Sequence, residues 1–439
     1  GLGAKNIKKS DGAGALANPA AADLDTVLVA DVIYDGTQFV LQNPGVAAAG
    51  LSLLDEDNMA SNSATAAASQ QSIKAYSDAT AEPNIARNPM LRFDQRAGTY
   101  TDLGTAVADL MDGYIMERIT SDGSARFTAT TETGGGINLA SDWLKFEVTT
   151  ADASPASDDG WSITQRLEGT YVQRLNQTTS GVKDFTYSAD VIAYAHGSSP
   201  GVSFPATGTV MFRSHDGTNY LYGSKFTIDS AATWQRINCT FAASALPTMT
   251  NDTGSACQFQ FFIDGGSTTK GKTTATWGTP TGGVSDSTHS PFADYAGNYI
   301  GFTNVDIYPG AAPRPFNPPL YHDDLTYCQR YYFRQDFDTA AHEYIVTCNV
   351  TSATLSRAVY WYPQVMRAVP SLSSSAAATW NVEDDDGTNI SVTTIGLTSQ
   401  VTKHNISVSL SFAGSATVGA GQWKRDGTDT SYIIGDADL

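Results

Sequence analysis

The side chains best placed for chemistry lie in one long polar stretch between Asp264 and Asn298. This stretch is rich in Gly, Ser, Thr and Pro and carries Trp277, His289 and Tyr295. It is outsized for a loop in a compact domain, and long loops on rigid scaffolds often carry function. An indole, an imidazole and a phenol can stack on a ligand or hydrogen-bond to it, so these three residues form our candidate site.

Other groups of polar residues are weaker candidates. The six histidines are scattered without metal-ligand spacing, although His342 stands beside the carboxylate of Glu343. Residues 384–389, Asp-Asp-Asp-Gly-Thr-Asn, offer oxygens to Ca²⁺, but the final Glu of a calcium loop is missing. A hairpin turn is the favoured interpretation of this segment. We expect no metal ion and no cofactor.

Signatures of the common enzyme classes are missing from the sequence. It contains no GxSxG nucleophile motif, no HExxH zinc helix, no phosphate-binding P-loop and no paired CxxC. We therefore expect a protein without catalytic activity.

Length and charge restrict the remaining classes. With 439 residues, the chain is too long for one comfortable core, so two or three packing units are expected. The 26 basic and 45 acidic residues give a net charge of −19, which would repel a phosphate backbone and argues against nucleic-acid binding. No apolar run approaches the ~20 residues that span a bilayer, and no signal peptide opens the sequence, so we expect no membrane insertion.

Strands are the dominant expected element. Charged residues make up only 16% of the sequence, and small and hydroxylated residues are abundant, which favours strands and turns over helices. Apolar and polar residues alternate along 185–193 and 406–412, as in antiparallel sheets with one buried face. The sequence thus predicts an all-β protein built of sandwiches.

The four cysteines fit this alternation. Cys239 and Cys257 fall on the apolar side of two predicted strands, while Cys328 and Cys348 lie further along the chain. This pattern favours buried thiols over disulfide bridges.

The beginning of the chain predicts a different structure. Two short strands, at 26–29 and 34–41, with a turn at Asp35-Gly36, form a hairpin too small to bury its own faces. Between 53 and 81, Met59, Ala66 and Ile73 recur at heptad spacing, which indicates a short helix. A flexible Ala/Ser linker is the alternative for this segment.

A cluster of prolines between Pro309 and Pro319 marks a domain boundary, because proline cannot donate to a sheet ladder. Four regions follow. They are an N-terminal β-segment (1–52), a helical connector (53–83), a central β-domain (84–315) and a C-terminal β-domain (316–439).

Several short sequence segments along the chain resemble segments of bacteriophage tail-fibre and tail-associated proteins. Residues 1–9 and 32–44 look like the small β-units of phage fibres, and 70–76 resembles the helical connector that follows them. Residues 325–332, 363–370 and 435–439 resemble their C-terminal β-domain.

The central domain resembles a jelly roll similar to carbohydrate-binding modules. The likeness is carried by residues 88–98, 163–168, 233–236 and 304–310, in that order. Tyr308 stands where this family often has an acidic residue, which puts any ligand or ion contact inferred there in doubt.

These resemblances imply a homotrimeric tail-fibre or receptor-binding subunit of a phage virion. Its N-terminal segment would join other tail proteins, and its jelly roll would bind a host-surface glycan, with Trp277, His289 and Tyr295 as the glycan-binding residues. The particle would act outside the cell after release. An equally good interpretation is that these three residues pin the loop to the sandwich or to a neighbouring subunit.

Three alternatives stay open. One is an architectural adaptor, collar or head-decoration protein, and another is a secreted bacterial carbohydrate-binding protein. A third is a polysaccharide-degrading tailspike, which needs two carboxylates about 5 to 9.5 Å apart and usually a repetitive parallel β-helix, a repeat not visible in this sequence.

Overall fold

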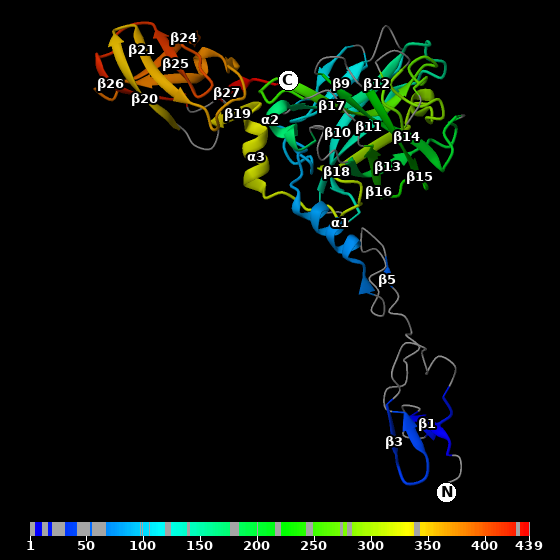
Figure 1. Cartoon of the computed structure of the whole chain (residues 1–439). Helices are drawn as coiled ribbons and strands as arrows, with labels where there is room; N and C mark the ends of the chain where they lie inside the picture. The colour runs from blue at the N-terminus through cyan, green and yellow to red at the C-terminus, as the bar shows by residue number, and fades with distance from the viewer. Residues whose placement is uncertain are drawn as a thin grey trace. The chain divides into compact units, whose positions relative to one another are not determined.

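A computed structural model gives the fold of the chain (Figure 1). The structure describes residues 5–10, 16–19, 31–41, 53–54, 67–96, 98, 100–104, 106–118, 124–137, 141–175, 184–199, 201–215, 221–242, 249–272, 275–278, 283–337, 343–426 and 431–438. The chain splits into two compact units, and these are Gly1–Thr80 and Ala81–Leu439.

The first unit contains a small four-stranded sheet of order β2-β1-β4-β3. Its strands are β1 (Ile7–Ser10), β2 (Leu16–Ala17), β3 (Val32–Tyr34) and β4 (Phe39–Leu41). The predicted turn at Asp35-Gly36 is confirmed. Asp35 Oδ1 accepts the backbone N–H groups of Thr37 and Gln38, both at 2.8 Å, and Gly36 has the positive φ of 98° that favours glycine. The strand expected at 26–29 lies outside the described residues.

A helix follows, as the heptad spacing predicts, but it is shorter than the segment 53–81. Strands β5 (Leu53–Leu54) and β6 (Ala67–Ala68) pair in parallel, and α1 runs over Gln70–Ala81. Ser69 caps its start, because its hydroxyl accepts the backbone N–H of Ser72 at 3.0 Å. Pro83 follows its end, where a helix cannot continue.

The second unit begins with a sandwich of two six-stranded antiparallel sheets. Sheet I has the order β16-β13-β18-β11-β10-β7 and sheet II the order β15-β14-β17-β12-β9-β8. Sheet I consists of β7 (Tyr100–Leu103), β10 (Arg126–Gly135), β11 (Ser141–Thr150), β13 (Phe185–Tyr194), β16 (Gln235–Phe241) and β18 (Tyr299–Pro309). Sheet II consists of β8 (Ala108–Asp109), β9 (Ile115–Arg118), β12 (Gly160–Glu168), β14 (Ala206–Ser214), β15 (Leu221–Ile228) and β17 (Ser255–Gly265).

Aromatic rings fill the space between the two sheets. Phe185 stacks on Phe241 at 5.0 Å, and Phe212 meets Phe259 edge-on at 5.3 Å. Short helical turns close the ends, namely α2 (Gly169–Val172), η2 (Gln173–Leu175) and η3 (Phe292–Asp294). The all-β class with a central jelly-roll sandwich is confirmed.

The rest of the second unit has its own core. Helix α3 (Tyr321–Gln329) leads into it and lies between the two cores in Figure 1. Six strands close into a barrel, namely β20 (Tyr344–Ser352), β21 (Leu355–Trp361), β25 (Asn405–Phe412), β24 (Asn389–Ser399), β23 (Trp380–Glu383) and β26 (Gly419–Arg425). A three-stranded sheet of β19 (Tyr332–Phe337), β27 (Ser431–Asp436) and β22 (Ser371–Ser374) accompanies it, with η4 at Ala377–Thr379.

The closed barrel corrects one detail of the sequence prediction, which expects a C-terminal sandwich. The alternating residues 406–412 do lie with their apolar members inside. A period of two shows that one face is buried, but both a second sheet and the curled sheet itself can bury that face. Trp380 and Trp423, with ring centroids 5.0 Å apart, fill the barrel interior.

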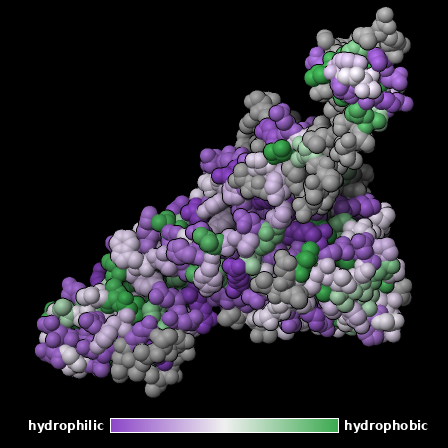
Figure 2. Space-filling view, turned by 90° about the horizontal axis from the view of Figure 1, so that it is seen from below, coloured by the Kyte–Doolittle hydropathy of each residue, from purple (hydrophilic) through white to green (hydrophobic). Residues whose placement is uncertain are grey.

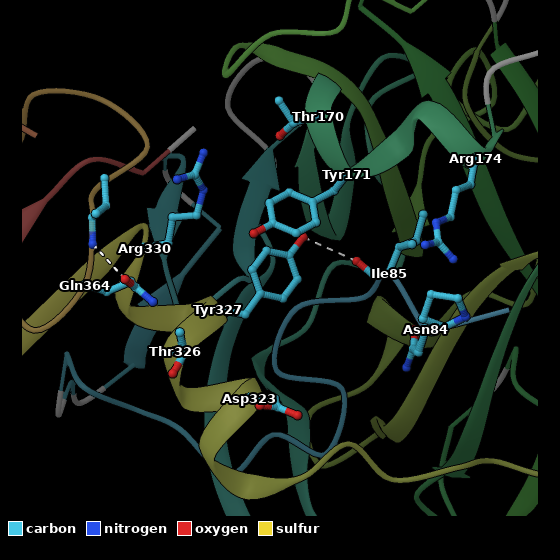
Figure 3. A pocket seen from close by; sticks show the side chains of 12 residues that line it. Asn84, Ile85, Thr170, Tyr171, Arg174, Asp323, Thr326, Tyr327, Arg330 and Gln364 are labelled. Carbon is cyan, nitrogen blue, oxygen red and sulfur yellow. Dashed lines mark hydrogen bonds between the residues drawn. The ribbon is translucent and has the colours of Figure 1, made fainter.

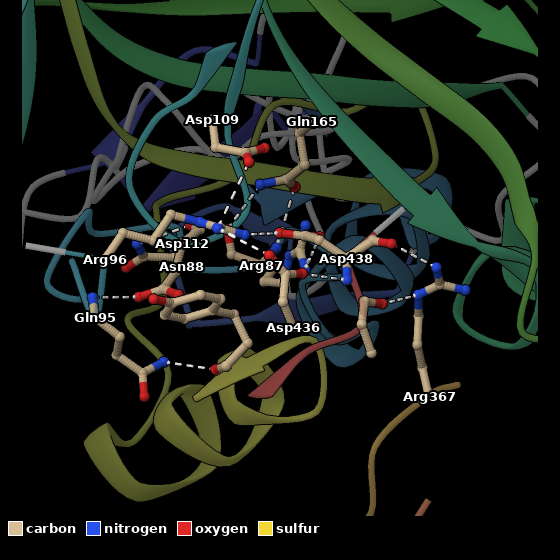
Figure 4. A network of polar contacts seen from close by, with 12 residues as sticks. Arg87, Asn88, Gln95, Arg96, Asp109, Asp112, Gln165, Arg367, Asp436 and Asp438 are labelled. Atoms are coloured by element: carbon tan, nitrogen blue, oxygen red, sulfur yellow. Dashed lines mark hydrogen bonds and ion pairs between the residues drawn. The ribbon is translucent and has the colours of Figure 1, made fainter. Parts of the chain in front are cut away.

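The buried Arg87 and the half-buried Arg96 and Arg367 join the sandwich to the barrel domain at a seam (Figure 4). Asp438, near the end of the chain, accepts Arg87 at 2.9 Å and Arg96 at 2.8 Å from the sandwich side. Arg367 donates to the backbone carbonyls of Asp438 and Thr253, both at 2.6 Å. Such buried, charge-assisted contacts hold the two parts as one compact unit.

The surface and the thiols agree with the composition. On the face that Figure 2 shows, hydrophobic residues form small separate patches among hydrophilic ones. All four cysteines are buried and free, so the prediction of thiols rather than bridges is confirmed. None of the helices in the described part of the chain is long and apolar enough to cross a membrane.

Candidate functional site

The structure gives Trp277 a packing position. Its indole lies half-buried against the sandwich core, edge-on to Phe212 at 5.7 Å, and its Nε1 donates to the carbonyl of Ala242 at 3.1 Å. Such contacts fasten the long loop to the sandwich.

His289 and Tyr295 have other neighbours. His289 is buried, its Nε2 is 2.9 Å from the carbonyl oxygen of Ile263, and burial lowers its pKa to about 3, so the ring is neutral. Tyr295 stacks on His196 with ring centroids 4.8 Å apart. Because Trp277, His289 and Tyr295 each contact different residues, the structure does not gather them into one surface. Their assignment to glycan binding stays a prediction.

A different set of rings lies together on the outer face of sheet I, and Trp143 is its centre. On β11 the buried Leu144, Phe146 and Val148 face the core, so the half-buried Trp143 faces outward. A Cβ added to Gly301 would lie 2.5 Å from this indole, as would one added to Gly135. The two glycines on the neighbouring strands thus give the ring a seat against the sheet.

Three further rings continue from Trp143 along the same face. Trp234 meets Trp143 edge-on, with centroids 5.3 Å apart, and the Tyr299 ring lies 6.3 Å from that of Trp143. Tyr194 stacks on Tyr299 at 5.4 Å. We call these four residues the aromatic strip. All of them are half-buried, so each keeps part of its ring surface open to solvent.

Charged groups border the strip. The Lys145 ammonium lies 5.0 Å from the centre of the Tyr299 ring and pairs with Glu147 on the same strand. Burial raises the pKa of the Tyr299 phenol, which keeps it protonated and able to donate a hydrogen bond.

A polar hollow of about 290 Å³ opens on the same outer face, where Arg236 lies two residues from Trp234 and Asp190 lies four residues from Tyr194. Its charged wall is Arg236, whose Nη1 lies 3.1 Å from Asp190 Oδ1 and 2.6 Å from the carbonyl of Asn304. The Nε and Nη2 atoms of Arg236 are buried and have no hydrogen-bond partner among the described residues. The guanidinium thus keeps two donors that no described group accepts, and its residue lines the hollow.

The polar groups of the hollow are held rigidly. Asn304 has a positive φ of 52°, and its side chain is fixed by Asp190 at 2.8 Å and by Ser141 at 2.6 Å. Gly136 allows this approach, since a Cβ there would lie 2.5 Å from Asn304 Nδ2. A positive φ outside glycine is costly and persists where the surroundings enforce it, often at functional sites.

Sequence reasoning missed the aromatic strip, although one signal was present. Buried residues alternate with Trp143, Lys145 and Glu147, and this alternation places a tryptophan on the solvent-facing side of a strand. The contribution of Trp234 and Tyr299 could not be read in this way, because the sequence does not specify which strands become neighbours.

The possible calcium loop is a turn, as the sequence favours. Asp384 Oδ1 accepts the backbone N–H of Thr388 at 2.9 Å, and Oδ2 accepts that of Thr417, also at 2.9 Å. These backbone hydrogen bonds lower the pKa of Asp384. Among the described residues, no group of three or more His, Cys, Asp or Glu side chains could hold a metal ion. His342 lies outside those residues.

Comparison with known proteins gives structural similarity only. No family model matches the chain, and no curated protein matches it. The chain is similar to the CBM22-1 and GH10 modules of a Clostridium thermocellum endo-1,4-β-D-xylanase solved with xylohexaose, at 12% identity and a TM-score of 0.24, over 49% of this chain and 30% of that one.

Two other similar structures are carbohydrate-binding modules. One is the family 11 module of a C. thermocellum cellulosomal cellulase, with 10% identity, a TM-score of 0.23, and coverage of 51% of this chain and 100% of that one. The other is a tandem of two family 22 modules from a Paenibacillus barcinonensis xylanase, with 9% identity, a TM-score of 0.22, and coverage of 78% and 99%. Structural similarity this low does not show which ligand the chain binds.

Proposed function

We propose that this protein is a glycan-binding protein without catalytic activity and that its binding surface is the aromatic strip with the adjoining polar hollow. The observation that carries the proposal is the seating of Trp143 on Gly135 and Gly301, with Trp234 and Tyr299 beside it. Aromatic rings held in fixed positions on a sheet, at low entropic cost, give a sugar surfaces on which to stack its apolar face.

The hollow supplies the complementary polar contacts. A sugar stacked on Trp143 and Trp234 presents hydroxyl groups toward the next residues of the face, where Arg236 has two donors without partners. Because Asp190 and Asn304 already fix the guanidinium, binding a hydroxyl there orders little that is mobile. This combination of an apolar platform and a few fixed polar groups is typical of small-molecule sites.

The test is a binding measurement with defined saccharides. Xylohexaose and the β-1,3-1,4-linked tetrasaccharide, bound by two of the similar structures, are the starting probes, followed by an array of bacterial surface glycans. We expect Trp143→Ala and Trp234→Ala each to weaken binding of any recognised glycan about tenfold, because each removes a stacking face.

The matched control is Trp361→Ala, which removes a 65% exposed tryptophan from the barrel. We expect it to leave glycan binding unchanged. Full binding by the Trp143→Ala, Trp234→Ala double variant would contradict the proposal. Release of sugar fragments from a bound polysaccharide would contradict the absence of catalysis.

The finer part of the proposal is a role as a homotrimeric tail-fibre or receptor-binding subunit in a phage virion. It is supported by the resemblance of residues 1–9, 32–44 and 70–76 to phage fibres. It is supported also by the small N-terminal sheet, where large apolar side chains are more than a third exposed. These are Ile7, Leu16, Val32, Ile33, Tyr34 and Phe39. Copies of the chain could bury these side chains against one another.

Oligomeric state tests this part separately. Native mass spectrometry of the full chain is expected to give a trimer, and replacement of Ile33 and Phe39 by Ser is expected to give monomers that still bind glycan. Three sites on one axis would raise the effective affinity about 10²- to 10⁴-fold for a surface that engages them together. A monomeric wild-type chain at micromolar concentration would remove the fibre role and leave the binding site untouched.

A further inference from the structure

A second cavity, separate from the aromatic strip, lies at the seam between the sandwich and the barrel domain (Figure 3). Its volume is about 590 Å³, within the range of about 300–1,000 Å³ typical of small-molecule sites. The sandwich contributes residues 83–85, Thr170, Tyr171 and Arg174 to its lining. Helix α3 and the loop at 364–365 contribute the rest. The cavity therefore exists only where the two domains meet.

Two tyrosines form an aromatic wall of this seam pocket. Tyr171 of α2 and Tyr327 of α3 are half-buried, with ring centroids 4.3 Å apart and planes inclined by 34°. Figure 3 shows the two rings one above the other, with the Tyr327 hydroxyl 3.5 Å from the carbonyl of Ile85. The rings come from both sides of the seam.

Side chains of both positive and negative charge surround this aromatic wall. Arg174 pairs with Glu82 at 3.0 Å, and Arg330 pairs with the fully buried Glu168 at 2.9 Å. Asp323 also lines the pocket. The two cations are thus each matched by a carboxylate, and a third carboxylate lies on the lining. An anionic ligand would gain no net charge attraction here.

Donors remain in spite of these pairs. The Nε atom of Arg330 is buried and has no hydrogen-bond partner among the described residues. On the barrel side, Gln364 uses its Oε1 to accept the backbone N–H of Val365 at 3.0 Å, and its amide NH₂ belongs to the same lining. An aromatic wall with such mixed, balanced polar groups suits a neutral ring that carries several hydroxyls.

We propose that the seam pocket is a second saccharide-binding site and that it takes a neutral sugar residue at the end of a glycan. The proposal rests on the glycan-binding function proposed above but on none of the residues of the aromatic strip. The strip offers an open row of rings that can follow a chain, whereas the seam pocket is a bounded cavity. A sugar in it contacts both domains and so stabilises the seam.

The experiment uses the full chain and the methyl glycosides of glucose, galactose and mannose as probes, with glucuronic acid as the charged comparison. Saturation-transfer NMR detects binding, and titration calorimetry measures it. We expect at least one neutral glycoside to bind and to raise the melting temperature, and glucuronic acid to bind at least tenfold more weakly.

The variants separate the seam pocket from the strip. Thr326→Trp fills the cavity from α3, and Gln364→Ala removes a polar contact. We expect the first to abolish glycoside binding and the second to weaken it severalfold. His322→Trp is the matched control, because this exposed residue of α3 does not line the cavity. It should bind normally, as should Trp143→Ala.

Three outcomes overturn the inference. One is a wild-type chain that binds none of the neutral glycosides, and another is unchanged binding in Thr326→Trp. The third is loss of glycoside binding in Trp143→Ala, which would place the sugar on the strip. Failure of glycan binding at the strip with retained glycoside binding at the seam would sink only the proposal for the strip.

Discussion

The sandwich and the barrel differ in how they arrange the aromatic residues that they turn outward. Outward positions of sheet I hold the aromatic strip, seated on glycines and in mutual contact. Outward positions of β25 in the barrel hold Asn405, Ser407, Ser409 and Ser411, and the neighbouring β21 adds the isolated Trp361. Residues 143–148 of β11 and residues 405–412 of β25 both alternate between an apolar and an outward side. Burial of the apolar side forms the core in both regions. The types of residue on the outward side decide whether that face can bind a ligand or only contacts solvent.

The two regions also differ in how their outer faces are covered. Residues 314–318 cover one end of sheet I. Arg314 donates two hydrogen bonds to the Asp306 carboxylate, at 2.6 and 2.8 Å, and its guanidinium lies 3.9 Å from the centre of the Tyr308 ring. Tyr308, the departure from the jelly-roll family pattern, is therefore a packing residue beneath an arginine. On the barrel, Arg357 of β21 is exposed.

The largest effect should come from this covered arginine. Arg314 and Asp306 are almost fully buried, with side chains 4% and 1% exposed, so Arg314→Met leaves a buried carboxylate without its cation. We expect a loss of about 3–5 kcal/mol in the free energy of unfolding, measured in urea. The control Arg357→Met should change it by less than about 0.5 kcal/mol. Equal losses of unfolding free energy in the two variants would show that the covered face of sheet I and the exposed face of the barrel do not differ in this respect.

The next effect concerns the seam between the two regions. Burial raises the pKa of Asp112 to about 7, well above its unfolded value near 4. The folded state therefore binds more protons than the unfolded state between these values. The stability that Asp112 contributes is full below about pH 4 and is lost as the pH rises through 7.

Asp112→Asn should remove this part of the pH dependence, at most about 1.4 kcal/mol per pH unit between pH 4 and 7. Urea unfolding at several pH values measures it. Asp324→Asn should act over a narrower window, because burial raises the pKa of Asp324 only to about 6. Parallel stability curves for wild type and Asp112→Asn would show that the carboxyl ionises normally in the folded protein.

The smallest effect sharpens the comparison through a matched pair of glycines. A Cβ at Gly301 would strike the Trp143 indole, while a Cβ at Gly396 of the barrel would meet the hydroxyl of Ser409, which can rotate away. We expect Gly301→Ala to weaken glycan binding severalfold by unseating the indole. Gly396→Ala should leave binding unchanged.

Replacing glycine by alanine also reduces the backbone entropy of the unfolded chain, a gain of about 0.5–1 kcal/mol that offsets part of the cost of moving the indole in Gly301→Ala. The measurement is calorimetric titration with the glycan that the wild-type chain binds. Equal binding by the two variants would mean that the seat of Trp143 is not needed.

Local features of the sequence predicted local structure well. The Asp35-Gly36 turn, a helix within the segment 53–81 and the strands at 185–193 and 406–412 depend on residues close in the chain, and all are present, the helix over Gln70–Ala81 only. The candidate residues in the long loop were chosen by residue type alone. Their surroundings, in which Trp277 packs on the core, depend on strands far away in sequence.

The sequence by itself determined that the chain is all-β, acidic, free of disulfides and provided with a small N-terminal β-unit, because composition and a period of two act locally. Only the tertiary structure decided that the C-terminal strands close into a barrel and that Trp143, Trp234 and Tyr299 meet on one face. It also decided that Asp438 folds back onto Arg87. The physical reason is that strand order and register place residues side by side across the sheet, and neither is written in any short stretch of sequence.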